Sequence, residues 1–238
     1  MRLILIGIMM LLLSGCSEKD MRQTYDLINA SVAEVPLTRQ EIVAALKESL
    51  SKGITRGAAL ASRKGGYLGN PQLKIEFPPD VIKVEKTLRG IGFGGEIDRF
   101  VKQLNRSAEK AAARARPIFV SAITALTIND AVEILNGAPD AATRYLKRTT
   151  GDELRKQFLP IVRETLNETS ATRYYGDIVK QYNALPLVAD VNPDLDQYAT
   201  DKAIDGLFVL IAEEEANIRA NPVARTTALM RRVFGSLD

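Results

Sequence analysis

The strongest constraint on the fold is a helical spacing of apolar residues that starts at Thr38 and continues, with short breaks, to the end of the chain. Thr38-Arg39-Gln40-Glu41 has the form of a capping box, in which the hydroxyl and the carboxylate each satisfy an N–H group at a helix start. One face of the helix that follows carries Ile42, Leu46, Ser49, Leu50, Gly53, Ile54, Gly57 and Leu60. We expect Gly53 and Gly57 to allow close packing against another helix.

Further helices are predicted from the same spacing at 80–90, 96–115, 117–126, 128–136, 139–149, 152–168, 171–184, 194–219 and 222–234. Three of their starts are marked by Thr127-Ile128-Asn129-Asp130, Thr150-Gly151-Asp152-Glu153 and Asn192-Pro193-Asp194. Near 72–78 the pattern changes, because Leu73, Ile75 and Phe77 alternate with Lys74 and Glu76. The sequence therefore predicts an all-α fold, a single compact domain of about ten helices over 38–238 with one short extended segment.

Residues 1–15 resemble a bacterial lipoprotein signal peptide. Arg2 supplies a positive charge, Leu3–Leu13 forms an apolar run, and Ser14-Gly15 places small residues before Cys16, the one cysteine of the chain. The run is shorter than the roughly 18 residues that span a bilayer. The resemblance implies that Cys16 receives a diacylglyceryl group, that cleavage occurs before it, and that the new N-terminus is acylated. We therefore expect a lipid anchor and no membrane-spanning helix.

The residue after the cysteine points to the destination of the mature protein. Gram-negative lipoproteins retained at the inner membrane usually carry aspartate there, whereas this chain has Ser17. We expect placement in the bacterial cell envelope, at the outer membrane and facing the periplasm. Residues 16–37 are interpreted as the lipidated cysteine and a tether, and some 20 residues of flexible coil span roughly 25 Å.

Composition excludes several classes of site. The chain has no histidine, and its one cysteine is expected to become a thioether. Disulfides, His/Cys metal sites and a Ser-His-Asp triad are therefore unavailable, and we expect neither a metal nor a cofactor. The formal net charge is +3, and removal of residues 1–15 takes away one cation, Arg2, so the mature chain is close to neutral. Global charge therefore predicts no partner.

Several phrases of the C-terminal two-thirds resemble the bacterial lipoproteins that share domain of unknown function 4197. These phrases are Thr143-Arg144-Tyr145-Leu146-Lys147-Arg148-Thr149-Thr150, Phe158-Leu159-Pro160-Ile161-Val162, Tyr182-Asn183-Ala184-Leu185-Pro186, Thr200-Asp201-Lys202-Ala203-Ile204-Asp205-Gly206-Leu207-Phe208, Ile211-Ala212-Glu213-Glu214-Glu215 and Arg225-Thr226-Thr227. The resemblance extends from about residue 40 to the C-terminus. It implies an envelope lipoprotein with a helical domain and supplies no activity, cofactor or catalytic residue.

Two short motifs match known sites but lack their context. Gly90, Gly92 and Gly95 fit G-x-G-x-x-G, yet a helix is predicted before them where a nucleotide fingerprint requires a strand, so we interpret them as a helix–helix connection. Ser49-Leu50-Ser51-Lys52 fits the S-x-x-K of penicillin-recognising enzymes, but Lys-Thr-Gly is absent and Ser49 lies on an apolar helix face.

A basic stripe is predicted on the helix at 96–115. At 100° per residue, its cations fall on the side opposite the apolar residues. They are Arg99, Lys102, Arg106, Lys110 and Arg114. We keep two interpretations open, a solvated or internally paired face and a binding site for anionic lipid or another anionic envelope polymer. Nucleic acid is not expected, because no aromatic residue interleaves with the cations.

The region 187–215 is acidic, with eight carboxylates (Asp190, Asp194, Asp196, Asp201, Asp205, Glu213, Glu214 and Glu215) against Lys202. Pairing of these acids with the basic stripe is the simplest account of both. Glu215 falls near the centre of the apolar face formed by Ile204, Phe208, Ile211 and Ile218, so we expect a buried acidic site that needs a basic partner. Arg144, Arg148 and Arg225 are the candidates. The alternative role is a ligand-binding or general-acid carboxylate.

These features favour a non-enzymatic, membrane-anchored module that binds an envelope protein or an anionic or apolar envelope ligand. The alternative is a cell-wall-active enzyme, because lytic transglycosylases are also helical lipoproteins that use one glutamate acid. Glu48-Ser49 resembles their Glu-Ser start, although the Gly-Leu-Met-Gln-type continuation is missing.

Overall fold

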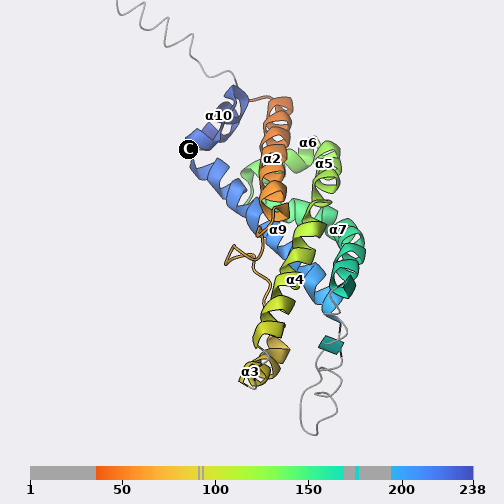
Figure 1. Cartoon of the computed structure of the whole chain (residues 1–238). Helices are drawn as coiled ribbons and strands as arrows, with labels where there is room; N and C mark the ends of the chain where they lie inside the picture. The colour runs from red at the N-terminus through yellow and green to blue at the C-terminus, as the bar shows by residue number, and fades with distance from the viewer. Residues whose placement is uncertain (1–35, 91, 93, 169–174, 177–193, 238) are drawn as a thin grey trace, which may run out of the picture. The chain divides into compact units, whose positions relative to one another are not determined.

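Two glycines of one helix bring it close to a second long helix in the computed structural model of the chain, which describes residues 36–90, 92, 94–168, 175–176 and 194–237. Helix α2 (Arg39–Ser62) packs against helix α9 (Leu195–Ala220) (Figure 1). A Cβ atom added to Gly53 would lie 3.2 Å from Cγ of Glu214, and one added to Gly57 would lie 3.4 Å from Cβ of Leu210. The expected close approach at these glycines is confirmed.

The all-α fold is also confirmed, with eight α-helices, two short 3₁₀ helices and no strand in the described part of the chain. The remaining elements are η1 (Pro79–Val81), α3 (Ile82–Gly90), α4 (Gly94–Ala112), α5 (Ala115–Ala125), α6 (Ile128–Asn136), α7 (Ala141–Glu168), η2 (Pro222–Ala224) and α10 (Ala228–Gly235). Helix α7 packs against α9 and α4, and α2 also contacts α4, α5, α6 and α10. Large side chains that are almost fully buried, such as Phe119, Phe158 and Leu104, fill the space between them.

The chain divides into a unit from Met1 to Thr38 and a second from Arg39 to Asp238. In the first unit only 36–38 are described, and these residues have no regular secondary structure. The expected signal peptide at 1–15, Cys16 and the tether up to residue 35 lie outside the described residues. The same holds for Asp190 and for the helix expected at 171–184, apart from Tyr175 and Gly176.

The expectation of separate helices at 139–149 and 152–168 is wrong, because α7 runs through Gly151 without a break. Thr150, which was expected to mark a helix start, bonds within α7 instead, as does its neighbour Thr149. Thr149 donates from Oγ1 to the carbonyl of Tyr145 at 2.9 Å, and Thr150 donates from Oγ1 to that of Leu146 at 2.7 Å. A hydroxyl committed to the preceding turn does not cap a new helix.

Two other predicted boundaries also move. Helix α4 ends at Ala112 and α5 begins at Ala115, so Arg114 lies in the turn between them and not on the helix expected at 96–115. The helix expected at 222–234 is divided into η2 and α10. Thr227 begins α10 because its side chain accepts a hydrogen bond from the Met230 N–H at 3.1 Å.

The extended segment near 72–78 is present without a partner strand in the described structure. Leu73, Ile75 and Phe77 are buried while Lys74 and Glu76 are exposed, as their alternation predicts. Asn105 of α4 stands in for the missing strand. Its Oδ1 accepts from the Ile75 N–H at 2.8 Å and its Nδ2 donates to the Ile75 carbonyl at 2.8 Å. The segment is thereby held on the helical core.

Two of the predicted helix starts are confirmed. Thr127 and Asp130 form a reciprocal capping box at α6, and these hydrogen bonds hold the pKa of the Asp130 carboxyl below its ordinary value. The side chain of Asp194 accepts from the Gln197 N–H at 3.0 Å at the start of α9. Short polar caps are visible in sequence because they act within three residues.

No single helix in the described residues is long and apolar enough to cross a membrane. Helices α5 and α6 reach that composition together, but they are bent by 103° at their junction (Figure 1).

Candidate functional site

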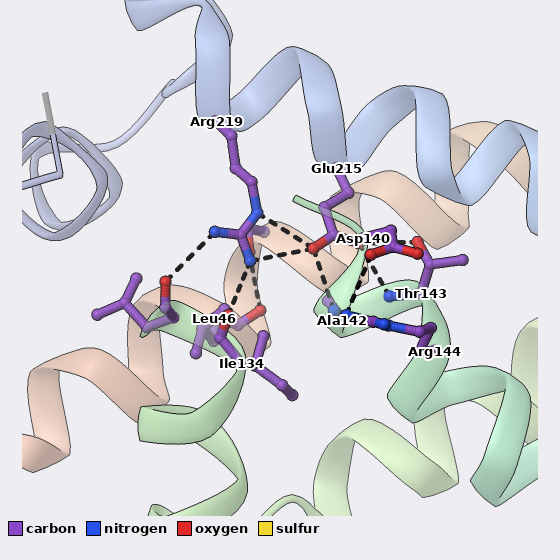
Figure 2. A network of polar contacts seen from close by, with 10 residues as sticks. Leu46, Ile134, Asp140, Ala142, Thr143, Arg144, Glu215 and Arg219 are labelled. Carbon is purple, nitrogen blue, oxygen red and sulfur yellow. Dashed lines mark hydrogen bonds and ion pairs between the residues drawn. The ribbon is translucent and has the colours of Figure 1, made fainter. Parts of the chain in front are cut away.

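Glu215 of α9 is buried against the first turn of α7. Its Oε1 accepts from the Ala142 N–H at 3.0 Å, and its Oε2 accepts from the Thr143 N–H at 2.8 Å and from Thr143 Oγ1 at 2.7 Å (Figure 2). The N–H groups of a first helical turn have no partner inside the helix. The carboxylate therefore caps α7 from a different helix and meets the positive end of its dipole.

Arg219, one turn further along α9, completes the arrangement. Its Nε and Nη2 each donate to Glu215 Oε1 at 3.1 Å (Figure 2). The same guanidinium donates from Nη2 to the carbonyl of Ile134 at 2.8 Å and from Nη1 to that of Leu135 at 3.3 Å. These carbonyls belong to the last turn of α6, which has the negative end of a helix dipole. We call Glu215 and Arg219 the α6–α7 clamp.

The clamp places each charge at the helix end of opposite sign. The Glu215 carboxylate accepts five hydrogen bonds, and the ion pair has side chains only 15% and 6% exposed at Arg219 and Glu215. A buried ion pair offsets its desolvation only when further hydrogen bonds satisfy its polar atoms, and here they do. A carboxylate with both oxygens occupied in this way is suited to holding α6, α7 and α9 together.

None of the three candidate partners expected for Glu215 is its ion-pair partner. Arg144 pairs with Asp140, and Arg148 lies over the ring of Tyr145. Arg225 is buried and donates to the carbonyls of Ile218 and Arg219, so it covers the C-terminal end of α9. The partner, Arg219, could have been found in the sequence, because a glutamate followed four residues later by an arginine is a favourable helical pair.

A small cavity lies beside the clamp, between α2, α7, α9 and α10. It has a volume of about 20 Å³ and is lined by residues that include Ser49, Gly53, Glu214 and Glu215. Such a volume holds about one water molecule, whereas ligand sites generally measure about 300 Å³ or more. Glu214 carries a buried Oε1 with no hydrogen-bond partner in the described structure, and its Oε2 lies 3.4 Å from Arg56. The cavity therefore accommodates solvent and no organic substrate.

Three of the five cations of the predicted basic stripe form ion pairs, two of them within α4 and one with α7. Arg99 pairs with Glu96 and Arg106 with Glu109, both three residues away, and Lys110 pairs with Glu168 of α7. Within the described residues, Lys102 and Arg114 make no ion pair. Lys102 borders an open depression of about 230 Å³ whose two carboxylates are already paired, Glu76 with Lys74 and Asp98 with Arg89.

The acids of α9 do not pair with that stripe, which corrects the expected internal pairing. Three of them meet bases of α7, which runs antiparallel to α9. Lys147 pairs with Asp205, Arg155 with Asp201 and Arg163 with Asp196, at 3.2, 3.0 and 2.8 Å. The apolar contacts between α7 and α9 set this register, and the charges on the borders of both helices then meet.

The remaining motifs have structural roles. The segment before Gly90 is helix α3, and Gly92 adopts a φ of +100° in the short connection to α4, so the glycines join two helices as expected. Ser49 donates from Oγ to the Leu46 carbonyl at 2.9 Å inside α2, and Lys52 donates to the Ala224 carbonyl. Glu48 is half-buried and accepts from the Oγ1 of Thr227, the cap of α10.

The comparisons with known proteins identify a family and nothing more specific. A family model described as Protein of unknown function (DUF4197) matches residues 36–235, which include nearly all of the described fold. No curated protein and no solved structure matches the chain significantly.

Proposed function

This chain belongs to the DUF4197 family of proteins of unknown function, and we propose that it is a non-enzymatic binding module of the bacterial cell envelope. In this proposal a lipid on Cys16 anchors the protein at the outer membrane, where the helical domain faces the periplasm. The module binds an envelope protein or an anionic or apolar envelope ligand.

The α6–α7 clamp is the observation that carries the proposal. Glu215, the acid that the sequence predicts to be buried, has both oxygens occupied by five hydrogen bonds, and the adjoining cavity has the volume of about one water. A general acid needs a proton that it can transfer and room for the substrate beside it. The clamp instead maintains the helical scaffold, so the outer surface is available for binding.

The surroundings of Glu48 do not favour the alternative role as a cell-wall enzyme either. It lies in the middle of α2 and accepts a hydrogen bond of 3.0 Å from Thr227. Thr227 in turn caps α10, so the carboxylate supports a helix start. A lytic-transglycosylase-like role would require this acid to face an open cleft.

The proposal is tested by crosslinking the acylated protein in living cells and identifying captured proteins by mass spectrometry. We expect reproducible capture of envelope partners by the wild type. In parallel, purified wild type and Glu48→Gln are incubated with peptidoglycan, and soluble fragments are measured. Cleavage by the wild type that Glu48→Gln abolishes, without any reproducible partner, would overturn the binding role.

The anchor has a separate test. The Cys16→Ala variant is expected to leave the membrane fraction, because the thiol is the proposed attachment point for lipid. Firm retention of Cys16→Ala in that fraction would contradict the lipoprotein assignment.

A further inference from the structure

Helix α5 has an outer surface that combines cations with exposed apolar side chains. Ala115, Phe119 and Ile123 are buried at a spacing of four residues, so one side of α5 faces the core. Arg116, Val120 and Thr124, one position further along, are exposed in a second row. With Arg114 in the preceding turn, we call these residues the α5 outer face.

Along the chain, the charged residues of this region have one sign, although Lys110 pairs with Glu168 of α7. No aspartate or glutamate occurs between Lys110 and Asn129, whereas Lys110, Arg114 and Arg116 are basic. Neither Arg114 nor Arg116 lies within 4.0 Å of a carboxylate in the part of the chain that is described. At the other end of α5, Lys47 donates from Nζ to the carbonyl of Thr124 at 2.8 Å, which places a third cation beside the face.

Two large apolar side chains of this region are exposed. Val120 is 43% exposed and Ile128, at the start of α6, is 41% exposed. Cations beside exposed apolar residues, with no interleaved acid, are the composition of surfaces that lie on an anionic bilayer. Because α5 buries its other side in the protein and bends by 103° into α6, it suits contact at the surface and not insertion.

We propose that the α5 outer face docks on anionic phospholipid headgroups. The inference rests on the proposed function, since the lipid on Cys16 would hold the domain near a bilayer. Lys47 follows the first residue of α2 by eight positions, a rise of about 12 Å, and it contacts the end of α5. The end of α5 therefore lies beside the part of α2 that follows Arg39, where the helical domain begins.

The test uses the acylated full chain in vesicles. Because the thiol of Cys16 is blocked by lipid in that protein, Val120→Cys supplies the sole thiol for an environment-sensitive fluorophore. The matched control is Val223→Cys in η2, where the valine is 86% exposed. The two labelled positions lie on different sides of α2. Lys47 bonds to the Thr124 carbonyl, one turn from Val120, and Lys52 bonds to the Ala224 carbonyl, next to Val223. The two lysines point about 140° apart around α2.

Vesicles of phosphatidylcholine alone are compared with vesicles that also contain phosphatidylglycerol, each with a quencher attached to the lipid chains. We expect quenching of the label at Val120→Cys in the anionic vesicles and none above background at Val223→Cys. Each cation near an anionic surface contributes roughly fivefold to docking, so adding both Arg114→Gln and Arg116→Gln should lower the ratio of docked to undocked protein about twenty-five-fold. Both arginines are exposed, so the folded domain tolerates their loss.

Flotation of the labelled protein with the vesicles tests the lipid anchor separately from docking of the α5 outer face. Protein that floats with both vesicle types supports the lipid anchor, and protein that fails to float contradicts the proposed function itself. If the protein floats but the label at Val120→Cys is unquenched, or is quenched equally in neutral vesicles or at Val223→Cys, the docking inference is wrong while the anchor stands.

Discussion

Asn105 pairs with the backbone of Ile75 through two hydrogen bonds of 2.8 Å, as a neighbouring β-strand would. Both residues are buried, and Asn105 Nδ2 also donates to the Val101 carbonyl at 2.8 Å. One side chain on α4 thus satisfies a peptide group that the helical core could not otherwise pair. The extended segment depends on this amide.

We expect Asn105→Ala to lower the free energy of unfolding by about 2–4 kcal/mol, because it leaves a buried N–H and a buried carbonyl of Ile75 without partners. Urea unfolding followed by circular dichroism measures the change. The control is Asn136→Ala. Among the described residues its exposed amide bonds to the Val132 carbonyl of its own helix, and its loss should cost below about 0.5 kcal/mol. Equal effects of the two variants would refute the role of Asn105.

The clamp predicts that alanine substitution of two nearby glutamates of α9 changes the free energy of unfolding by very different amounts. Glu215→Ala removes one member of a buried ion pair and uncaps α7, so the free energy of unfolding should fall by about 3–5 kcal/mol. Glu213→Ala, two residues earlier at an exposed position, should change it by less than about 0.5 kcal/mol. Chemical unfolding of both variants decides the matter, and a small effect at Glu215 would contradict a structural role for the clamp.

Replacement of two helical glycines by alanine should change the stability of the protein in opposite directions. A Cβ on Gly206 of α9 would lie 2.7 Å from Cε1 of Tyr67, so Gly206→Ala should destabilise by about 1–3 kcal/mol through overpacking. Nothing lies within 4 Å of a Cβ built on Gly151 of α7, so Gly151→Ala should stabilise by about 0.5–1 kcal/mol. Thermal unfolding of the two variants is the measurement. Destabilisation by Gly151→Ala would mean that α7 is interrupted there after all.

Tyr67 predicts a loss of stability at alkaline pH. Its side chain is fully buried and donates from the hydroxyl to the Ala203 carbonyl at 2.5 Å, and burial raises the pKa of the phenol well above its ordinary value of 10.0. The raised pKa belongs to the folded state. The contribution of the protonated Tyr67 side chain to the free energy of unfolding is therefore complete below pH 10 and is lost as pH rises further. Between wild type and Tyr67→Phe, the difference in the free energy of unfolding should be constant from pH 7 to about 10. Above that it should fall by about 1.4 kcal/mol per pH unit.

A difference that stays constant up to pH 11 would contradict this linkage. Comparison with the variant, and not the wild-type pH profile alone, isolates Tyr67 from the other tyrosines and lysines that titrate in the same range.

Sequence alone determined those features whose signals act over a few residues. Thr127 and Asp194 begin helices because their side chains bond N–H groups three residues ahead. The glycines at 53 and 57 and the alternation of Leu73, Ile75 and Phe77 indicated close packing and an extended segment, because spacing alone sets which side chains share a face. These signals were sufficient for the all-α fold and for most of its helices.

Tertiary structure decided which charges meet. Glu215 was recognised as an acid on an apolar face, but its capping of α7 depends on where Ala142 and Thr143 lie when α7 packs on α9. The same packing brings three acids of α9 into ion pairs with Lys147, Arg155 and Arg163 of α7. Three cations of the basic stripe pair instead with Glu96, Glu109 and Glu168. Burial of apolar surface selects the helix faces that touch, and charges on their borders pair with whatever that contact brings near.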